Sequence, residues 1–419
     1  MNLFIKAVTI IDSKSDYHNK TQDILIENGI ITKIASNLQN PNSYQELTFD
    51  NLHISQGWFD SSVSFGTPGY EERETLENGV QTAAKSGFTA VGLNSNTNPP
   101  IDNNSSVTFI KSKTKNSAVD VHPIGALTSA SKGIDLAELY DMTQAGAIAF
   151  GDYKTPISNA NLMKIALLYA SNFDSLVCAF PQDNSIAQKG VMNEHINSTK
   201  LGLKGIPALA EELQVARDVF LLEYTGGKLH IPTISTAKSV ALIREAKQRK
   251  LNISCSVAIH NLFFTDDALT DFDTKYKVSP PLSTQNDIDA LISGVKDGTI
   301  DMVTSDHNPL NIELKKLEFD YATCGTIGLE SAFGALNTLF STKKTIQLLT
   351  QGKERFGIKH QTIDVGNPIN ATLFNPNKTY EFSNENIYSK SKNSIFLGHS
   401  LKGKAIGVIH NNTIVLTPN

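Results

Sequence analysis

The sequence has few cysteines and no long apolar run. Its three cysteines, Cys178, Cys255 and Cys324, are odd in number and far apart, which argues against a disulfide framework and against a Cys-x-x-Cys metal knuckle. No apolar run reaches 18 residues, and the opening MNLFIKAVTIIDSKSD lacks a basic region followed by an apolar stretch. We therefore expect no membrane contact and no secretion, and we predict a cytoplasmic protein in a reducing compartment.

A strong excess of charge of either sign is also lacking. The 37 Lys and Arg residues stand against 42 Asp and Glu residues, so the formal net charge is −5. This balance gives no electrostatic reason to expect nucleic acid as a partner, and it fits a small-molecule or protein-binding role better. The 419 residues are enough for two ordinary domains, or for one large barrel with a small additional domain.

The two ends of the chain are rich in predicted β-strands, whereas the middle alternates between strands and helices. Residues 1–54 contain LFIKAVTIID and DILIENGIITKIA, with Asn28-Gly29 as a hairpin signal, and residues 361–419 contain similar runs with Asn411-Asn412 as a turn. Residues 55–360 alternate strands such as FTAVGL with amphipathic helices such as TAKSVALIREAKQRK. This alternation favours a closed parallel barrel, in which active groups lie at the C-terminal ends of the strands.

Several segments, taken in order, resemble dihydroorotases of the type related to allantoinases and hydantoinases. The segment GWFDSSVSFGTPGYEERETLENGVQTAAKSGFTAV is similar to the opening family pattern Gly-Phe-x-Asp-x-His-x-His-x-Arg-x-Pro-Gly, and NSNTNPP, KVSPPL, TSDHNPL and GTIGLESA follow in the family's order. The resemblance implies a TIM-like (β/α)8 barrel of the metal-dependent hydrolase type over residues 55–360. It also implies a small β-sandwich domain built from residues 1–54 plus 361–419.

Active relatives hold zinc, which activates a water molecule for opening or closing a cyclic amide. In the family pattern two ligands are a His-x-His pair, whose side chains share one face of a strand. The resemblance assigns six metal-ligand positions. Four of them hold residues that ligate zinc poorly or not at all: Ser62 and Ser64 in place of the histidine pair, and Phe180 and Thr233 in place of two further histidines. The other two hold the retained carboxylates Asp152 and Asp306. An un-ionised hydroxyl is a poor zinc ligand and an aromatic ring is none. We therefore predict no metal cofactor.

The substrate-binding positions implied by the resemblance are also replaced. The arginine that would clamp a carboxylate corresponds to Gly66, which has no side chain. Other substrate positions correspond to Ser279, Ser283 and Leu310, and of the expected carboxylate contacts only Asn96 remains. Asp306 is the one catalytic group in its expected place, and without a metal a lone carboxylate more often holds a structural hydrogen bond.

Other residues leave alternatives open. Lys154, if carboxylated, could bridge metals, or it could form an ordinary ion pair or lie on the surface. His260 with nearby aspartates could form a replacement centre, although no known ligand spacing supports it. Cys178 could be a nucleophile, but no oriented base accompanies it. His230 matches a histidine that is not a ligand in the family, so a role in the core or beside the ligands is expected.

Three functional hypotheses follow. The first is a non-catalytic dihydroorotase homologue of pyrimidine biosynthesis that acts as a structural or regulatory partner; the resemblance implies aspartate transcarbamoylase as that partner. The alternative is an active cyclic amidohydrolase with an atypical metal site. The third is a ligand-sensing module that binds a pyrimidine-like molecule in the remaining pocket. The resemblance further implies a homo-oligomer. It also implies a dihydroorotase-family hydrolase, which we predict to be inactive, although the sequence leaves open whether the chain is an enzyme.

Overall fold

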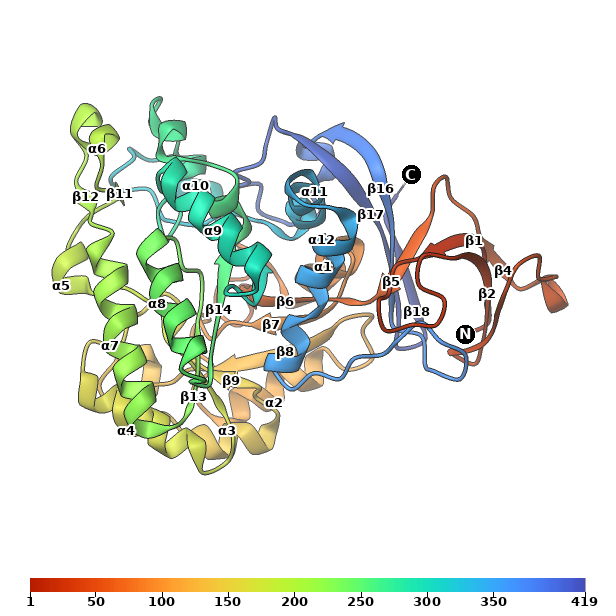
Figure 1. The fold of residues 1–419 in the computed structure, drawn as a ribbon, viewed down its shortest axis with the longest axis horizontal. Helices are drawn as coiled ribbons and strands as arrows, with labels where there is room; N and C mark the ends of the chain where they lie inside the picture. The colour runs from red at the N-terminus through yellow and green to blue at the C-terminus, as the bar shows by residue number, and fades with distance from the viewer. Residues whose placement is uncertain (419) are drawn as a thin grey trace.

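The structure is a computed structural model that describes residues 1–418, except for the side chain of Asn42. Its larger lobe is a barrel of parallel strands in the hydrogen-bonded order β15-β14-β13-β10-β9-β8-β7-β6 (Figure 1). A parallel bridge between Val63 and His307 joins the first strand to the segment that follows the last one. The strands are β6 (Trp58–Val63), β7 (Phe88–Leu93), β8 (Asp120–Gly125), β9 (Ala149–Phe150), β10 (Leu176–Cys178), β13 (Lys228–Ile231), β14 (Ile253–Ala258) and β15 (Met302–Thr304).

Helices follow the strands and cover the outside of the barrel. The covering helices are α1 (Leu76–Lys85), α2 (Asn104–Lys113), α3 (Leu139–Ala145), α4 (Ala160–Ser171), α7 (Leu209–Thr225), α8 (Ala237–Gln248), α9 (Gln285–Asp297) and α11 (Leu329–Leu339). Helix α12 (Thr342–Thr350) packs against β6 and β15. Shorter elements lie in the connections: α5 (Asn184–Ala187), β11 (Met192–Asn193), α6 (Ile196–Leu201), β12 (Gly205–Ile206), α10 (Ile312–Lys315) and α13 (Gly352–Arg355). The predicted TIM-like fold class is thereby confirmed.

The β-rich ends of the chain pair with each other in the second lobe. Strand β16 (Ala371–Glu381) lies antiparallel to β5 (His53–Gln56), so that Leu373 is opposite Ile54. One hydrogen-bonded sheet results, in the order β18-β17-β16-β5-β1-β2-β3 with β4 beside β1. The other strands are β1 (Leu3–Ile10), β2 (Thr21–Glu27), β3 (Ile30–Ala35), β4 (Gln45–Leu47), β17 (Ser400–His410) and β18 (Thr413–Leu416).

The two predicted turns form as the sequence indicates. Asn28 and Gly29 link β2 to β3 with φ of 53° and 78°, and Asn411 and Asn412 link β17 to β18 with φ of 49° and 57°. A two-residue hairpin turn of type I′ needs positive φ at both central residues, which glycine and asparagine accept at low cost. These turns therefore set the register of both hairpins.

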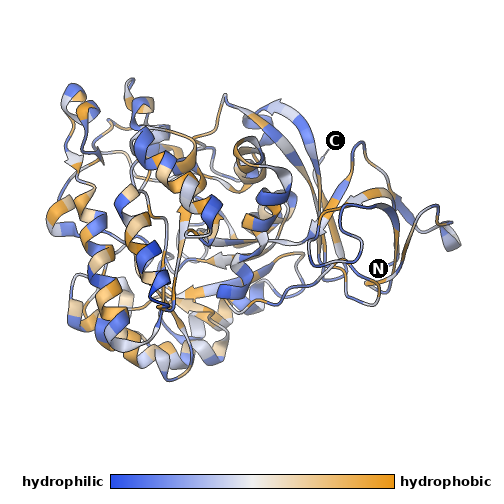
Figure 2. Cartoon of the chain, viewed as in Figure 1, coloured by the Kyte–Doolittle hydropathy of each residue, from blue (hydrophilic) through white to orange (hydrophobic). Residues whose placement is uncertain are grey.

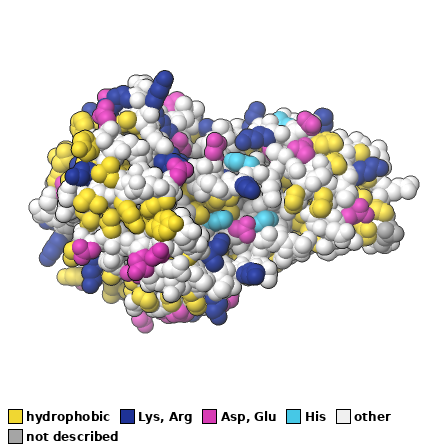
Figure 3. Space-filling view, turned by 90° about the horizontal axis from the view of Figure 1, so that it is seen from below, with side chains coloured by type: hydrophobic (Ala, Val, Ile, Leu, Met, Phe, Trp, Pro, Cys, Tyr) yellow, Lys and Arg dark blue, Asp and Glu magenta, His cyan; other side chains and the backbone are white. Residues whose placement is uncertain are grey.

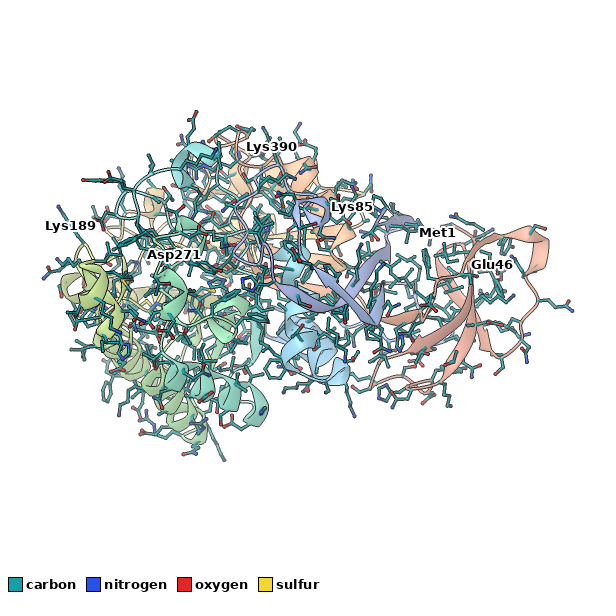
Figure 4. All side chains as sticks on the ribbon, turned by 90° about the horizontal axis from the view of Figure 1, so that it is seen from above. Met1, Glu46, Lys85, Lys189, Asp271 and Lys390 are labelled. Atoms are coloured by element: carbon teal, nitrogen blue, oxygen red, sulfur yellow. The ribbon has the colours of Figure 1, made fainter. Side chains whose placement is uncertain are left out.

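Each lobe has its own hydrophobic core, and the single tryptophan joins the two lobes. The indole of Trp58, at the start of β6, lies 4.7 Å from the ring of Phe333 on α11 and 5.7 Å from that of Phe374 on β16. Figure 2 shows hydrophobic residues along the barrel strands and along the strands of the terminal sheet. Figure 4 places Met1 and Glu46 in the lobe of the terminal sheet, far from Lys189 and Asp271 in the barrel lobe. Among the described residues, no helix is long and apolar enough to cross a membrane.

Candidate functional site

The C-terminal ends of the barrel strands surround a small cavity. Its volume, measured as the room for the centre of a water molecule, is about 30 Å³. One water molecule needs roughly 10–15 Å³ on this measure, so the cavity holds a few waters and is too small for a cyclic amide. The residues around it include Ser62, Asn94, Tyr153, Lys154, Phe180, His230, Thr233, Ser256 and Asp306.

An ion pair lies at the centre of this site. Nζ of Lys154, which follows β9, lies 2.7 Å from Oδ2 of Asp306, which follows β15. Their side chains are 16% and 2% exposed, so little solvent screens the pair. Burial opposes the charge on Lys154, but the Asp306 carboxylate outweighs it and raises the pKa of the ammonium group above its ordinary value. Lys154 is therefore expected to carry its proton at neutral pH, while burial raises the pKa of the Asp306 carboxyl beside it above its ordinary value.

Two hydroxyl groups complete the side-chain contacts of Asp306 that the structure describes, and an amide group binds one of these hydroxyls. Oδ1 of Asp306 accepts hydrogen bonds from Ser62 Oγ at 3.3 Å and from the Tyr153 hydroxyl at 3.4 Å. Asn94, at the end of β7, donates from Nδ2 to Ser62 Oγ at 3.2 Å and to Ser64 Oγ at 3.3 Å. The two serines therefore belong to a buried hydrogen-bond network that orients the Asp306 carboxylate.

Asp152 is retained in the sequence, but its carboxylate points away from Asp306. Its Oδ1 accepts hydrogen bonds from the backbone N–H groups of Leu127 at 2.8 Å and Thr128 at 3.0 Å, and its Oδ2 accepts one from the Thr128 hydroxyl. Burial raises the pKa of this carboxyl above its ordinary value. Asp152 thus fixes the loop after β8 and does not face the cavity.

The backbone at three site residues adopts the left-handed conformation. Tyr153, Thr233 and Asp306 have φ of 52°, 48° and 48°, although none is a glycine. Such a conformation is costly for a β-branched residue such as Thr233 and is concentrated at functional sites. The strand ends therefore have an unusual backbone geometry. The side chains there offer little for metal binding, because Thr233 supplies only a hydroxyl and Phe180, which is 4% exposed, fills space with its ring.

The histidines of the site are buried and neutral. Nδ1 of His230 lies 2.9 Å from Ser254 Oγ and its Nε2 lies 3.2 Å from Ser256 Oγ. His307 accepts hydrogen bonds at Nδ1 from the N–H groups at the start of α11. Burial lowers the pKa of His230, His260 and His307 to about 3 in each case. His230 has the core role expected for it.

The position of the missing arginine has no room for a side chain. A Cβ atom on Gly66 would lie 1.9 Å from the carbonyl oxygen of Tyr70 and 2.6 Å from that of Glu74. The loop is closed onto Gly66 by its own hydrogen bonds, Gly66 N–H to the Glu74 carbonyl at 2.9 Å and Tyr70 N–H to the Gly66 carbonyl at 2.7 Å. Backbone atoms therefore fill the space in which the side chain of a carboxylate-binding arginine would begin.

Four of the remaining predicted residues, Asn96, Ser279, Ser283 and Leu310, take no part in the cavity wall. Asn96 is partly exposed and its buried Oδ1 has no hydrogen-bond partner among the described residues. Leu310 and Ser283 are buried, at 2% and 4% exposure, and Ser279 is partly exposed. Cys178 does line the cavity, but burial raises the pKa of its thiol to about 12, so it is a poor nucleophile at neutral pH.

The residues around Asp306 do not fit a zinc ion. Within residues 1–418, no group of three or more His, Cys, Asp or Glu side chains is placed to hold a metal. Zinc sites in proteins use at least three such ligands, and the one carboxylate that faces the cavity already contacts an ammonium group. A second cation beside Lys154 would be repelled in this poorly screened position.

Comparison with known proteins identifies the family. A family model described as "Dihydro-orotase-like" matches residues 53–239. The dihydroorotase of Pelotomaculum thermopropionicum is 38% identical over 423 residues, covering 99% of both chains, and that of Acetivibrio thermocellus is 37% identical over 422 residues with the same coverage. The chain belongs to the dihydroorotase family.

Solved structures confirm the fold of this dihydroorotase-family protein. The L-hydantoinase from Arthrobacter aurescens superposes with a TM-score of 0.85 at 18% identity, covering 99% of this chain and 96% of the other. The dihydropyrimidinase from Brevibacillus agri gives 0.83 at 20% identity, covering 99% and 95%. These structural matches show that the chain shares its fold with both proteins, while the relatives show the dihydroorotase family.

Sequence reasoning missed two members of the site. Asn94 and Tyr153 both contact the Ser62 and Asp306 network, yet neither was a candidate from the sequence. A partial signal was available, because Asn94 begins the segment NSNTNPP, and Ser62 and Ser64 stand where the family pattern has its histidine pair. Small polar side chains that are buried together are expected to hydrogen-bond to one another.

Proposed function

We propose that this dihydroorotase-family protein does not catalyse zinc-dependent opening or closing of a cyclic amide, and that it serves as a structural or regulatory partner of aspartate transcarbamoylase in the cytoplasm. The observation that carries the proposal is the 2.7 Å contact between Lys154 Nζ and Asp306 Oδ2. In this arrangement the ammonium group supplies the positive charge next to the aspartate, so the carboxylate is satisfied without a metal ion.

The chemistry of the site supports this proposal. Hydrolysis of an unactivated amide needs a nucleophile, a base to take its proton and a group that stabilises the developing oxyanion. Asp306 is engaged by Lys154, Ser62 and Tyr153, and the neutral histidines His230 and His307 have their Nδ1 atoms in hydrogen bonds. The cavity also leaves no room for a substrate ring.

The partnership rests on a different kind of support. The barrel, the terminal sheet and both hairpins are complete although the catalytic groups are replaced, which fits a protein retained for its shape. A non-catalytic relative of the enzyme that uses carbamoyl aspartate would act next to the enzyme that makes it, and aspartate transcarbamoylase is that enzyme by reaction order.

The test combines metal analysis, activity and complex formation. The chain is purified with zinc present, dialysed and analysed for metal, and then assayed with dihydroorotate and with carbamoyl aspartate; the Acetivibrio thermocellus relative is treated identically. We expect far less than one zinc per chain, no turnover above a blank, and co-elution with the aspartate transcarbamoylase of the same organism. Stoichiometric zinc with turnover in either direction would refute the non-catalytic function.

A second candidate is an active cyclic amidohydrolase with an atypical site. The names of the relatives favour it more than the first, because chains 37 to 38% identical along their full length are called dihydroorotases. Asp306 at the barrel mouth also remains in place. Under this candidate, turnover is present in the wild type and is lost in Asp306→Asn, whereas under the first neither protein has any activity.

A further inference from the structure

A second hollow lies between the two lobes, and we call it the interlobe pocket. Its wall is built by the loop from β1 to β2, by Gln56 at the end of β5, and by α12 and α13. Gln56 precedes β6, and Gln351 in the same wall donates to the carbonyl of Asp301 just before β15. The pocket is therefore at the N-terminal ends of these barrel strands, opposite to the cavity. Figure 3 shows histidine side chains between the lobes, with Lys and Arg side chains around them.

The interlobe pocket has the size of a small-molecule site. Its volume, measured as the room for the centre of a water molecule, is about 380 Å³, against about 30 Å³ for the cavity on the same measure. Ligand pockets in proteins usually have roughly 300–1,000 Å³ and are common where two domains meet. The pocket therefore has room for a metabolite that the cavity excludes.

Contacts between the lobes hold the wall of the pocket in place. Oδ2 of Asp12 accepts a hydrogen bond from the Ile363 N–H at 3.1 Å, and its Oδ1 accepts one from Gln56 Nε2 at 3.4 Å. The Ser15 hydroxyl donates to the Ile363 carbonyl at 2.7 Å. These bonds tie the loop after β1 to the segment that leads from the barrel to β16. A ligand would thus meet a preformed pocket, which keeps the ordering cost of binding low.

Two lysine side chains of the pocket lack a partner of opposite charge. Across residues 1–418, the ammonium groups of Lys14 and Lys343 have no hydrogen bond or ion pair, and both side chains are exposed. The carboxylate of Asp12 is 2% exposed and is engaged by its N–H donors, so Glu354 is the one other acid in the described wall. Two cations thus face one free carboxylate, and an anionic ligand group would balance them.

The kind of cation favours phosphate over carboxylate. No arginine is among the described residues of the wall, so the planar fork that holds a carboxylate by two parallel bonds is lacking. Lysine binds as a point charge and is a common partner of phosphate oxygens. We therefore expect the anionic group of the ligand to be a phosphate.

Two histidine rings of the wall have nitrogen atoms that lack partners. Among the described residues, both ring nitrogens of His18 and Nε2 of His360 are buried without a hydrogen bond. Nδ1 of His360 lies 2.8 Å from Gln56 Oε1, which only accepts, so this nitrogen carries the proton. Burial and the Lys14 ammonium group lower the pKa of His360, so its ring is neutral at neutral pH and Nε2 is an acceptor.

The free nitrogen atoms indicate what else the ligand carries. A buried polar atom without a partner lowers stability, so a ligand group that supplies the partner gains affinity. A hydroxyl group can donate to Nε2 of His360. An imidazole always has at least one N–H, and that of His18 can donate to a phosphate oxygen.

We propose that the interlobe pocket binds a small phosphate monoester that carries hydroxyl groups, such as a sugar phosphate or a nucleoside monophosphate. The phosphate lies at Lys14 and Lys343, and a hydroxyl donates to His360. The free carboxylate of Glu354 accepts from a further hydroxyl. Because the pocket and the cavity share no residue of their walls, the proposal does not depend on whether the Asp306 site is catalytic.

Calorimetric titration of the full chain at low ionic strength tests the ligand class. We expect ribose 5-phosphate to bind with a dissociation constant on the order of 0.1–1 mM, which is usual for a ligand of its size, and ribose not to bind. Adenosine monophosphate distinguishes the two sources of the phosphate. Tighter binding than that of ribose 5-phosphate assigns the pocket to a nucleotide, and equal or weaker binding assigns it to a sugar phosphate.

Variants test the residues that bind. The double variant Lys14→Met with Lys343→Met changes two exposed side chains and should fold normally, but it should bind ribose 5-phosphate at least about tenfold more weakly. The control pair Lys115→Met with Lys189→Met changes two exposed lysines outside the pocket and should bind as the wild type does.

His360→Phe separates the hydroxyl contact from the phosphate contact. It removes the acceptor Nε2 and keeps an aromatic ring, so it should weaken binding of ribose 5-phosphate and leave the weaker binding of inorganic phosphate unchanged. Three results would overturn the proposal: no binding of either phosphate monoester at about 10 mM, the same affinity in the wild type and the lysine double variant, or equal weakening in the control pair.

Discussion

Lys154 Nζ and Asp306 Oδ2 lie 2.7 Å apart although the two residues follow different strands, β9 and β15, and are 152 positions apart in the sequence. The contact links opposite sides of the barrel mouth. Ser62 and Tyr153 bind the second oxygen of the same carboxylate, so Asp306 is contacted by side chains from the ends of two other strands, β6 and β9. The resemblance assigns Asp306 to a metal-ligand position, but in this structure its carboxylate belongs to a network of one ion pair and two hydrogen bonds.

Removing the ammonium group should destabilise the fold. Lys154→Met leaves the carboxylate of Asp306, 2% exposed, without its counter-charge. Removing one partner of a buried ion pair costs about 3–5 kcal/mol of stability. Because Lys154 is itself partly exposed, we expect the free energy of unfolding to fall by about 2–4 kcal/mol. Urea denaturation at pH 7 measures the loss.

The double variant supplies the control. Lys154→Met with Asp306→Asn removes both charges, so it should be more stable than Lys154→Met alone by at least 1 kcal/mol. Equal stability of the single and double variants would mean that the pair has no electrostatic role and would remove the main support for a built-in cation.

The sequence predicts much of the fold but only part of this site. Asn28-Gly29 and the alternating barrel segments encode local geometry, which is why the hairpin and the barrel could be predicted. The ion pair of Lys154 was one of several open possibilities, because the left-handed backbone of Tyr153 that precedes it is not visible in the residue types. Likewise, Asp152 keeps its identity, yet its partners Leu127 and Thr128 lie a full strand earlier.

A side chain at Gly66 should not be tolerated. Its Cβ would meet backbone oxygens at 1.9 and 2.6 Å, which cannot move without opening the loop. We expect Gly66→Ala to lower the free energy of unfolding by more than 2 kcal/mol. Gly133→Ala, which has positive φ but nothing within 4 Å of its Cβ, should cost only about 1 kcal/mol. Similar losses in both variants would show that the loop is not closed onto Gly66.

The three thiols should differ in reactivity. Cys178 and Cys324 are both partly exposed and Cys255 is fully buried. The surroundings of the Cys178 thiol raise its pKa to about 12, and burial also raises the pKa of the Cys255 thiol. The thiolate is the reactive form. With a chromogenic disulfide reagent at pH 8, we expect one fast thiol per folded chain, absent in Cys324→Ser, and three after denaturation. Fast labelling of Cys178 in the folded protein would contradict the closed cavity.

Acid should destabilise the protein partly through His230. Burial lowers its pKa from 6.5 to about 3, so between these values the unfolded chain takes up a proton that the folded chain does not, and stability falls as the pH falls. One such proton changes the free energy of unfolding by about 1.4 kcal/mol per pH unit. Between pH 6 and 4.5, the free energy of unfolding of His230→Gln should therefore fall by about 2 kcal/mol less than that of the wild type. Buried carboxyls with raised pKa values, such as Asp152, have the opposite effect on stability, but the effect is the same in both proteins.

Ser254→Ala is the control. It removes a hydrogen-bond partner of the ring and keeps the histidine, so the pH dependence of its stability should match that of the wild type. Parallel curves for His230→Gln and the wild type would mean that His230 is protonated in the folded protein.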